Sequence, residues 1–328
     1  MPSSVTHSYF CNDVYEKIDK SIKSKLSSSY DMMRIFAQGP DPYFFYDFHL
    51  TPRSRRVYWI SNSMHHSKIN EHFLSLIKYI NDKNYYDNDM VLAYLYGQIC
   101  HFSLDTTCHP YIVYSSGRYY KKEKSTYKYN GKHEDMEYFI DRYLIWKREK
   151  ILPKKYKMYK ELFKIKPFNN ELKDVIDNVM KNVYGYDNVS KIYYKSIKNM
   201  KKFYYVFNYD RYGIKKIFYT IMDFFGGNLF VKKREMSFYN SYNDKLYYLN
   251  NDKNEWNHPT NKEEIYNYSF TELYIKAINK AVNIINSVDK MLKDKKIDKE
   301  EVYKLFGNLD YGTGKDCNLE LDSIYFKY

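Results

Sequence analysis

The stretch HFSLDTTCHP at residues 101–110 constrains the fold more than any other part of the sequence. Its ligand-type residues His101, Asp105 and His109 follow one another at intervals of four. Residues four apart lie on the same face of an α-helix, so these side chains would line about two helical turns. A second pair, His133 and Glu137, has the same spacing. Because imidazoles and carboxylates are zinc ligands, the chain is predicted to build a helical scaffold around a metal site.

Apolar residues recur at helical intervals along most of the chain, and alternation of period two is almost absent, so the predicted class is all-α. Asp87 or Asn88 can cap the helix that carries His101, Pro110 is expected to end it, and Ser269 with Glu272 forms a capping-box pattern. Residues 111–131 and 231–258 are expected to be loops, the second with at most a short hairpin, and Trp256–Pro259 to lead into the next helix. Helices are predicted over residues 9–26, 30–37, 64–80, 90–110, 132–150, 169–183, 189–206, 213–225, 269–288 and 298–306.

The sequence has no internal repeat and no Gly/Ser linker, which favours one all-α domain over residues 1–328. Within it, residues 1–150 form the metal-binding half, and residues 151–328 form a helical, more basic half. The net charge is +13, but residues 1–150 carry 21 basic and 17 acidic residues, so the excess lies mostly away from the His/Asp cluster. We interpret the charge as a solvated basic surface, with peripheral contact to an anionic membrane or a nucleic acid as alternatives.

The chain has four cysteines, and no two of them form a C-x-x-C pair. The sequence therefore indicates neither a thiolate zinc site nor a disulfide-stabilised scaffold. No signal peptide and no apolar run of membrane-spanning length are recognisable, so a cytoplasmic location is expected. The abundance of Lys, Asn, Ile and Tyr, including 41 tyrosines, is typical of an AT-rich genome.

Asp41 stands in the sequence Gly39-Pro40-Asp41-Pro42. Two prolines make a rigid turn, because each fixes its own φ and restricts the residue before it. Such a turn could aim the carboxylate at a site, although an Asx turn without function is the simpler interpretation. The aromatic run that follows is either core or part of a pocket for a cationic or apolar head group; its candidate pocket residues are Tyr43, Phe44 and Tyr46.

Eight residues are candidate metal ligands, and eight of the nine histidines lie before residue 134. This number of nitrogen and oxygen donors exceeds what one zinc takes and suits two or three ions with a bridging carboxylate. Such sites activate water and clamp phosphate oxygens, which indicates phosphoester hydrolysis. The alternative is that these are ordinary core and surface histidines. The candidates are His7, Asp41, His65, His101, Asp105, His109, His133 and Glu137, with His66 as the alternative to His65.

The ordered motifs of residues 1–142 resemble the zinc-dependent phospholipase C family, which includes clostridial α-toxin and a Bacillus phosphatidylcholine-preferring enzyme. The chain is most similar to short intracellular Firmicutes members. The matching residues are Met1-Pro2-Ser3 with His7, Gly39-Pro40-Asp41, Met64-His65-His66, Cys100–Pro110, and His133 with Glu137.

The resemblance implies an all-α fold, shared with single-strand nucleases, with zinc ions in a cleft between helices. It implies a first zinc on Asp41, His65, His101 and Asp105, and a second on His109, His133 and Glu137. A third would be held by His7, with Asp105 bridging. Asp41 would be the general base, and a metal-activated water would cleave a phospholipid into diacylglycerol and a phosphorylated head group.

The third zinc of secreted members is also held by an N-terminal Trp, whereas Met1 or Pro2 stands in that region here. Two other functions stay open. One is a zinc-dependent single-strand nuclease or other phosphodiesterase, and the other is a catalytically silent, metal-stabilised helical protein that binds a membrane or partner.

Overall fold

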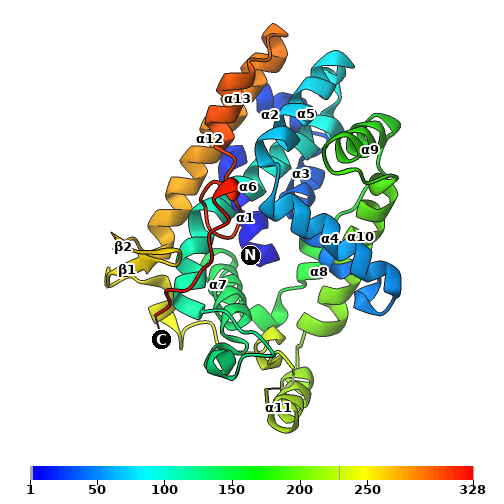
Figure 1. Cartoon of the computed structure of the whole chain (residues 1–328). Coiled ribbons are helices and arrows are strands. Elements are labelled where there is room, and N and C mark those ends of the chain that lie inside the picture. The colour runs from blue at the N-terminus through cyan, green and yellow to red at the C-terminus, as the bar shows by residue number, and fades with distance from the viewer. Residues whose placement is uncertain (1–2, 229, 328) are drawn as a thin grey trace.

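The structure, a computed structural model, describes residues 3–228 and 230–327, and helices dominate it (Figure 1). The all-α prediction is confirmed. The helices are α1 (Ser4–Lys17), α2 (Lys20–Leu26), α3 (Tyr30–Phe36), α4 (Pro52–His66), α5 (Ile69–Asp82), α6 (Asp89–Ser116), α7 (Lys132–Glu149), α8 (Met158–Glu161), α9 (Asn170–Tyr184), α10 (Val189–Phe203), α11 (Ile214–Gly226), α12 (Phe270–Asp294) and α13 (Lys299–Phe306). Short 3-10 turns include η1 (Asp41–His49), η3 (Lys124–Tyr129), η6 (Arg234–Met236), η7 (Leu246–Leu249) and η8 (Cys317–Leu319).

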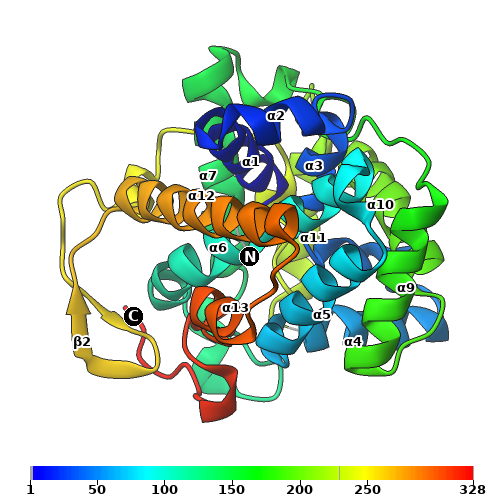
Figure 2. The ribbon, with the colours of Figure 1, turned by 90° about the horizontal axis from the view of Figure 1, so that it is seen from above.

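Helix α6 is the centre of the packing. It is buried on nearly every side, as expected for a helix that is apolar all round. It packs against α1, α3, α7 and α12, and Figure 2 shows α12 lying across it. One hydrophobic core runs from Val5 to Tyr311 and includes residues of both halves of the chain. The ligand-type side chains of α6 are therefore held in the interior.

The chain also has a two-stranded antiparallel hairpin, β1 (Trp256–His258) and β2 (Asn261–Tyr266), with Trp256 paired to Tyr266. A helix follows residues 256–259 as expected, with the second strand of the hairpin between them and α12. The loop predicted at 231–258 is irregular except for η6, η7 and the first strand. No helix among the described residues combines the length and apolarity needed to cross a membrane.

Two helix caps were predicted correctly. The side chain of Asn88 accepts a hydrogen bond from the N–H of Val91 at the start of α6. Ser269 and Glu272 form the reciprocal capping box at the start of α12. Both caps satisfy N–H groups that the first helical turn leaves without partners.

The prediction that Pro110 ends its helix is wrong, because α6 continues to Ser116. A proline inside a helix leaves the carbonyl four residues earlier without its donor, here that of Thr106. The backbone of Gly314 lies so close to this carbonyl that a Cβ there would be 2.4 Å from the oxygen. The packed C-terminal tail thus covers the Thr106 carbonyl, which lacks its helical donor. As a result, the first six residues of the predicted 111–131 loop are helical.

Two other helix boundaries differ from the prediction. His65 and His66 end α4 and do not begin a helix, because Ser67 is extended and Lys68 is left-handed before α5 starts. The helix predicted over residues 9–26 is divided into α1 and α2, since Ile18 is extended. In both places the apolar spacing continues across the break, so periodicity alone does not reveal it.

Candidate metal centre

The three ligand-type residues of α6 lie on one buried face. The exposed fraction is 0% for His101 and Asp105 and 5% for His109. One turn separates each from the next, as the spacing of four predicts. Four other elements, α1, η1, α4 and α7, bring further donors against this face.

The first group consists of Asp41, His65 and His101. His65 Nε2 lies 3.2 Å from Asp41 Oδ1, and His101 Nε2 lies 3.8 Å from the same oxygen. Asp41 is held by the turn at Gly39, whose φ is +53° and where a Cβ would be 2.3 Å from the His101 ring. Only glycine fits this left-handed, crowded position, so the turn and the His101 ring are matched to each other.

The second group consists of His7, His101 and Asp105. His7 Nε2 lies 3.3 Å from Asp105 Oδ1, and His101 Nε2 lies 3.2 Å from Asp105 Oδ2. The rings of His7 and His101 stack with centroids 4.4 Å apart. His101 therefore takes part in both groups, and the two oxygens of Asp105 face different histidines. Met1 and Pro2, considered above for a third metal, lie outside the described residues.

The third group consists of His109, His133 and Glu137. Glu137 Oε1 lies 3.0 Å from His133 Nε2 and 3.7 Å from His109 Nε2. Asp105 Oδ2 is 3.9 Å from His109 Nδ1, so α6 connects this group to the other two. All eight candidate residues thus converge in one region of the molecule.

Each of four imidazoles uses its Nδ1 for a contact that points away from the centre. His65 Nδ1 lies 2.8 Å from the carbonyl oxygen of Ser61, and His101 Nδ1 lies 3.2 Å from that of Ala37. The partners of His109 and His133 are the Tyr311 carbonyl at 3.0 Å and the Ser116 hydroxyl at 3.2 Å. Such outer contacts fix the tautomer and ring orientation of metal-binding histidines, and they leave Nε2 directed inward.

The inward atoms lack hydrogen-bond partners. Among the described residues, no hydrogen bond reaches Nε2 of His7, His65, His101 or His109, Oδ1 of Asp41, or either oxygen of Asp105. Buried polar atoms without partners cost free energy, so a cluster of them needs an explanation. Zinc binds this set of neutral nitrogen and anionic oxygen donors, and the residues therefore fit the metal.

Burial sets the protonation of the groups. It lowers the pKa of His65 to about 3 and that of His109 to about 4, so both rings are neutral near pH 7. Burial raises the pKa of Asp41 to about 7. The pKa of Asp105 lies well below its usual range, because His101 and His109 outweigh the opposing effect of burial. Neutral imidazoles are the form in which histidine binds metal.

His65 and His66 have different surroundings. His65 joins the Asp41 group, whereas His66 Nδ1 contacts the carboxylate of Asp310 and its side chain is 48% exposed. The C-terminal tail also reaches His65, because Tyr311 N–H donates to its carbonyl at 3.0 Å.

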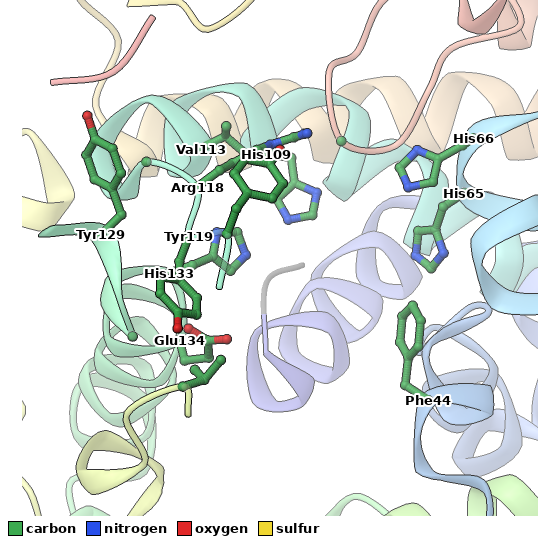
Figure 3. A pocket seen from close by; sticks show the side chains of 15 residues that line it. Phe44, His65, His66, His109, Val113, Arg118, Tyr119, Tyr129, His133 and Glu134 are labelled. Carbon is green, nitrogen blue, oxygen red and sulfur yellow. The ribbon is translucent and has the colours of Figure 1, made fainter. Parts of the chain in front are cut away.

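A cavity of about 400 Å³ opens beside the donors (Figure 3). Phe44, His65, His109 and His133 line it. The other two predicted pocket residues are almost completely buried, with Tyr43 1% and Tyr46 3% exposed. The Tyr43 ring packs against Tyr193, and the ammonium of Lys195 lies over the Tyr46 ring. The wall also includes Val113, Gly117, Arg118, Tyr119, Tyr120, Tyr129, Gly131, Glu134, Val231 and Gly312.

Arg118 is a cavity residue that the sequence analysis missed. It follows Gly117, the residue that ends α6, and lines the same cavity as His109 (Figure 3). Within residues 3–228 and 230–327 its guanidinium makes no hydrogen bond or ion pair, so it is available to an anion. Its sequence context, Ser-Gly-Arg-Tyr in a polar stretch, carries no signal of this position.

A helical scaffold that gathers eight nitrogen and oxygen donors, some of them lining a cavity, is able to bind metal. The family described as zinc dependent phospholipase C matches residues 6–188, a range that contains all eight donors. The chain belongs to the zinc-dependent phospholipase C family. No curated protein and no solved structure matches the chain significantly.

Proposed function

We propose that this chain hydrolyses a phospholipid in the manner of a phospholipase C, releasing diacylglycerol and a phosphorylated head group. The observation that carries the proposal is the cluster of eight candidate donors, several without hydrogen-bond partners, of which His65, His109 and His133 line a cavity of about 400 Å³. The family acts on phosphodiesters of this kind through zinc. The cavity is of a size that accepts a small polar head group.

Asp41, His65 and His101, with Asp105, would hold one zinc ion. His109, His133 and Glu137 would hold a second. His7 would hold a third together with Asp105, whose two oxygens already face His7 and His101. Zinc at these residues supplies Lewis-acid polarisation of the phosphate and of water.

Asp41 is the proposed general base. Its Oδ1 is buried, and no hydrogen bond from a described residue reaches it. In the reaction a water oxygen bonds to phosphorus, and the bond between phosphorus and the glycerol oxygen breaks. Asp41 takes a proton from the water, and the glycerol oxygen gains one as diacylglycerol leaves.

Arg118 is the proposed phosphate-binding side chain. A guanidinium presents a planar fork of donors that matches two phosphate oxygens, and burial in a cavity wall strengthens such a contact. Phe44, Tyr119 and Tyr120 provide an aromatic wall for the remainder of the head group.

The zinc-loaded protein should be assayed with short-chain phosphatidylcholine, bis-p-nitrophenyl phosphate and single-stranded DNA side by side. Turnover of the lipid, with release of diacylglycerol, is the expected result. Turnover of DNA without lipid would favour the nuclease alternative. Failure to hydrolyse all three substrates at full zinc occupancy would favour the catalytically silent alternative.

The metal assignment is tested separately by zinc content per chain. We expect two to three zinc ions in the wild type and the loss of at least one in Asp105→Asn, because Asp105 connects the groups. Asp87→Asn, at an exposed carboxylate paired with Lys25, is the matched control and should keep all its zinc. One ion or none in the wild type would contradict a multi-zinc centre.

A further inference from the structure

Helix α11 turns its polar side to the protein and its apolar side to solvent. The Tyr219 hydroxyl donates to the Phe207 carbonyl at 2.9 Å, and Asp210 accepts from the N–H of Lys216 at 2.9 Å. Asp223 accepts from the backbone N–H of Lys233 at 2.8 Å. These bonds lie on the polar side of the helix, and they fix its orientation on the protein. In Figure 1 α11 projects from the rest of the fold.

The opposite side of α11 is apolar and exposed. In a helix of about 3.6 residues per turn, its apolar residues fall on one face. That face normally packs on the core of a water-soluble protein, and contiguous exposed apolar patches mark interaction sites. The exposed fractions are 70% for Ile214, 63% for Ile217, 56% for Phe218, 51% for Ile221, 40% for Met222, 80% for Phe224 and 81% for Phe225.

Basic residues are frequent in the segment that carries this apolar face. Residues 211–235 contain six basic and two acidic side chains. Glu235 pairs with Arg142, which lies outside this segment, at 3.0 Å, and Asp223 accepts backbone hydrogen bonds but keeps its charge. Six basic and two acidic residues give the segment a net charge of +4. The basic residues are Arg211, Lys215, Lys216, Lys232, Lys233 and Arg234.

The segment after α11 is anchored to the wall of the cavity. Asn130 donates to the Phe230 carbonyl at 3.0 Å and accepts from the N–H of Lys232 at 3.1 Å. The ring of Phe230 is 66% exposed and extends the apolar face, while Val231 lines the cavity. The apolar face of α11 and the cavity are thus consecutive parts of one surface.

We propose that α11, with Phe230, is a membrane-docking surface that inserts its apolar face into an anionic phospholipid bilayer. Phe, Ile and Met side chains would enter the head-group and acyl boundary, and the basic residues would contact anionic head groups. Docking would bring the cavity to the lipid surface. This last consequence rests on the proposed function, whereas binding to the bilayer does not.

Charge favours a bilayer over a second copy of the chain. A two-fold dimer through α11 would place the same patch against itself and bring together two segments that each carry a net charge of +4. Like charges at an interface are unfavourable, whereas a bilayer with anionic lipids supplies the opposite charge.

The test is flotation of the zinc-loaded chain with vesicles of phosphatidylcholine and phosphatidylglycerol, compared with phosphatidylcholine alone. Binding should be stronger to the anionic vesicles and should weaken with salt. The double substitution Phe224→Ser with Phe225→Ser should lower the partition coefficient roughly tenfold or more, because buried apolar area supplies most of such binding. The control, Leu50→Ser with Leu319→Ser, removes two apolar side chains outside α11 that are 83% and 59% exposed, and it should bind as the wild type does.

Hydrolysis of soluble bis-p-nitrophenyl phosphate is measured on the same proteins. The α11 variant should retain wild-type turnover, since Phe224 and Phe225 do not line the cavity. Vesicle binding without any turnover would overturn the proposed function but support the docking surface. No vesicle binding by the wild type, equal binding by the α11 variant, or a dimer that α11 substitution dissociates would overturn the docking surface.

Discussion

Asp141 accepts two hydrogen bonds from Thr6, one from its backbone N–H at 2.8 Å and one from its hydroxyl at 2.7 Å. A third comes from the N–H of Val5 at 3.1 Å. Asp141 lies on α7 one turn after Glu137, and Thr6 precedes His7 on α1. Because the first N–H groups of a helix have no partner within it, this carboxylate caps α1 and joins two helices that carry candidate ligands.

Replacing Asp141 with Ala should destabilise the protein by about 2–3 kcal/mol, because it leaves two buried N–H groups unsatisfied. The zinc ion proposed at His7 should also be lost. Asp141→Asn should lose less stability, since its one amide oxygen still accepts from Thr6, although its NH2 group cannot accept from Val5. Burial already raises the pKa of this carboxyl to about 6, so the loss of its charge alone should matter little near that pH. Urea unfolding and zinc content measure the two effects. An Ala variant as stable as the Asn variant would contradict the capping role.

The adjacent residues His65 and His66 provide a matched pair. His65→Ala should remove at least one zinc and abolish hydrolysis, because His65 faces Asp41. His66→Ala should keep the full zinc content, because that ring contacts Asp310 instead. Zinc per chain, measured by plasma mass spectrometry, separates them, and the reverse outcome would assign the ligand to His66.

Arg118→Ala should raise KM for a phosphodiester and weaken inhibition by inorganic phosphate, each roughly 10- to 100-fold, the range expected for a charge-assisted hydrogen bond. Arg118→Lys should recover only part of this loss, because an ammonium cannot bind two oxygens in one plane. Zinc content should not change. Arg55→Ala, at an exposed arginine of α4, is the control, and an equal effect there would point to general charge instead.

Lys280 should make the free energy of unfolding depend on pH in the alkaline range. Its ammonium donates to the Thr106 hydroxyl at 2.8 Å and lies 4.5 Å from the Phe102 ring centre, and burial lowers its pKa from 10.5 to about 8. Between these two pH values the unfolded chain holds a proton that the folded chain has lost, so this group increases stability as pH rises. At pH 7 burial of the charged ammonium is expected to lower the free energy of unfolding by up to about 3 kcal/mol.

Lys280→Met should therefore be more stable than the wild type at pH 7, with a smaller difference at pH 10. Urea unfolding at the two pH values gives the comparison. Lys290→Met, at an exposed lysine of the same helix, should show no such pH dependence. A Lys280→Met difference that stays constant with pH would show that the ammonium is not penalised by burial.

Those parts of the candidate site that depend on local spacing could be predicted from the sequence. The side chains of His101, Asp105 and His109 share a face because helical periodicity alone puts them there. His7 and Asp41 have no such spacing; the Pro-Asp-Pro turn and the accumulation of histidines made them candidates, and the family resemblance gave them a place among the ligands. Arg118 and the carbonyl of Tyr311 lie in the site through contacts between distant segments, which no local pattern encodes.

The same limit explains the errors in the fold. Pro110 is a helix breaker in isolation, and it is tolerated because Gly314, more than 200 residues later, covers the Thr106 carbonyl. The break at Ser67 and Lys68 depends on backbone conformation, while the apolar periodicity continues across it. The hairpin of β1 and β2 is short, and its strands are too brief for alternation to identify them.

The contacts of Tyr311 affect the stage of protein synthesis at which the candidate metal centre can form. Its carbonyl orients His109, its N–H holds the backbone of His65, and Gly314 covers the interior of α6. The ribosome synthesises the eight candidate donors before this tail, because the last of them, Glu137, precedes Tyr311 by 174 residues. During this interval the donors of the nascent chain lack the contacts that Tyr311 and Gly314 provide. The complete centre can therefore form only after residue 314 has been synthesised.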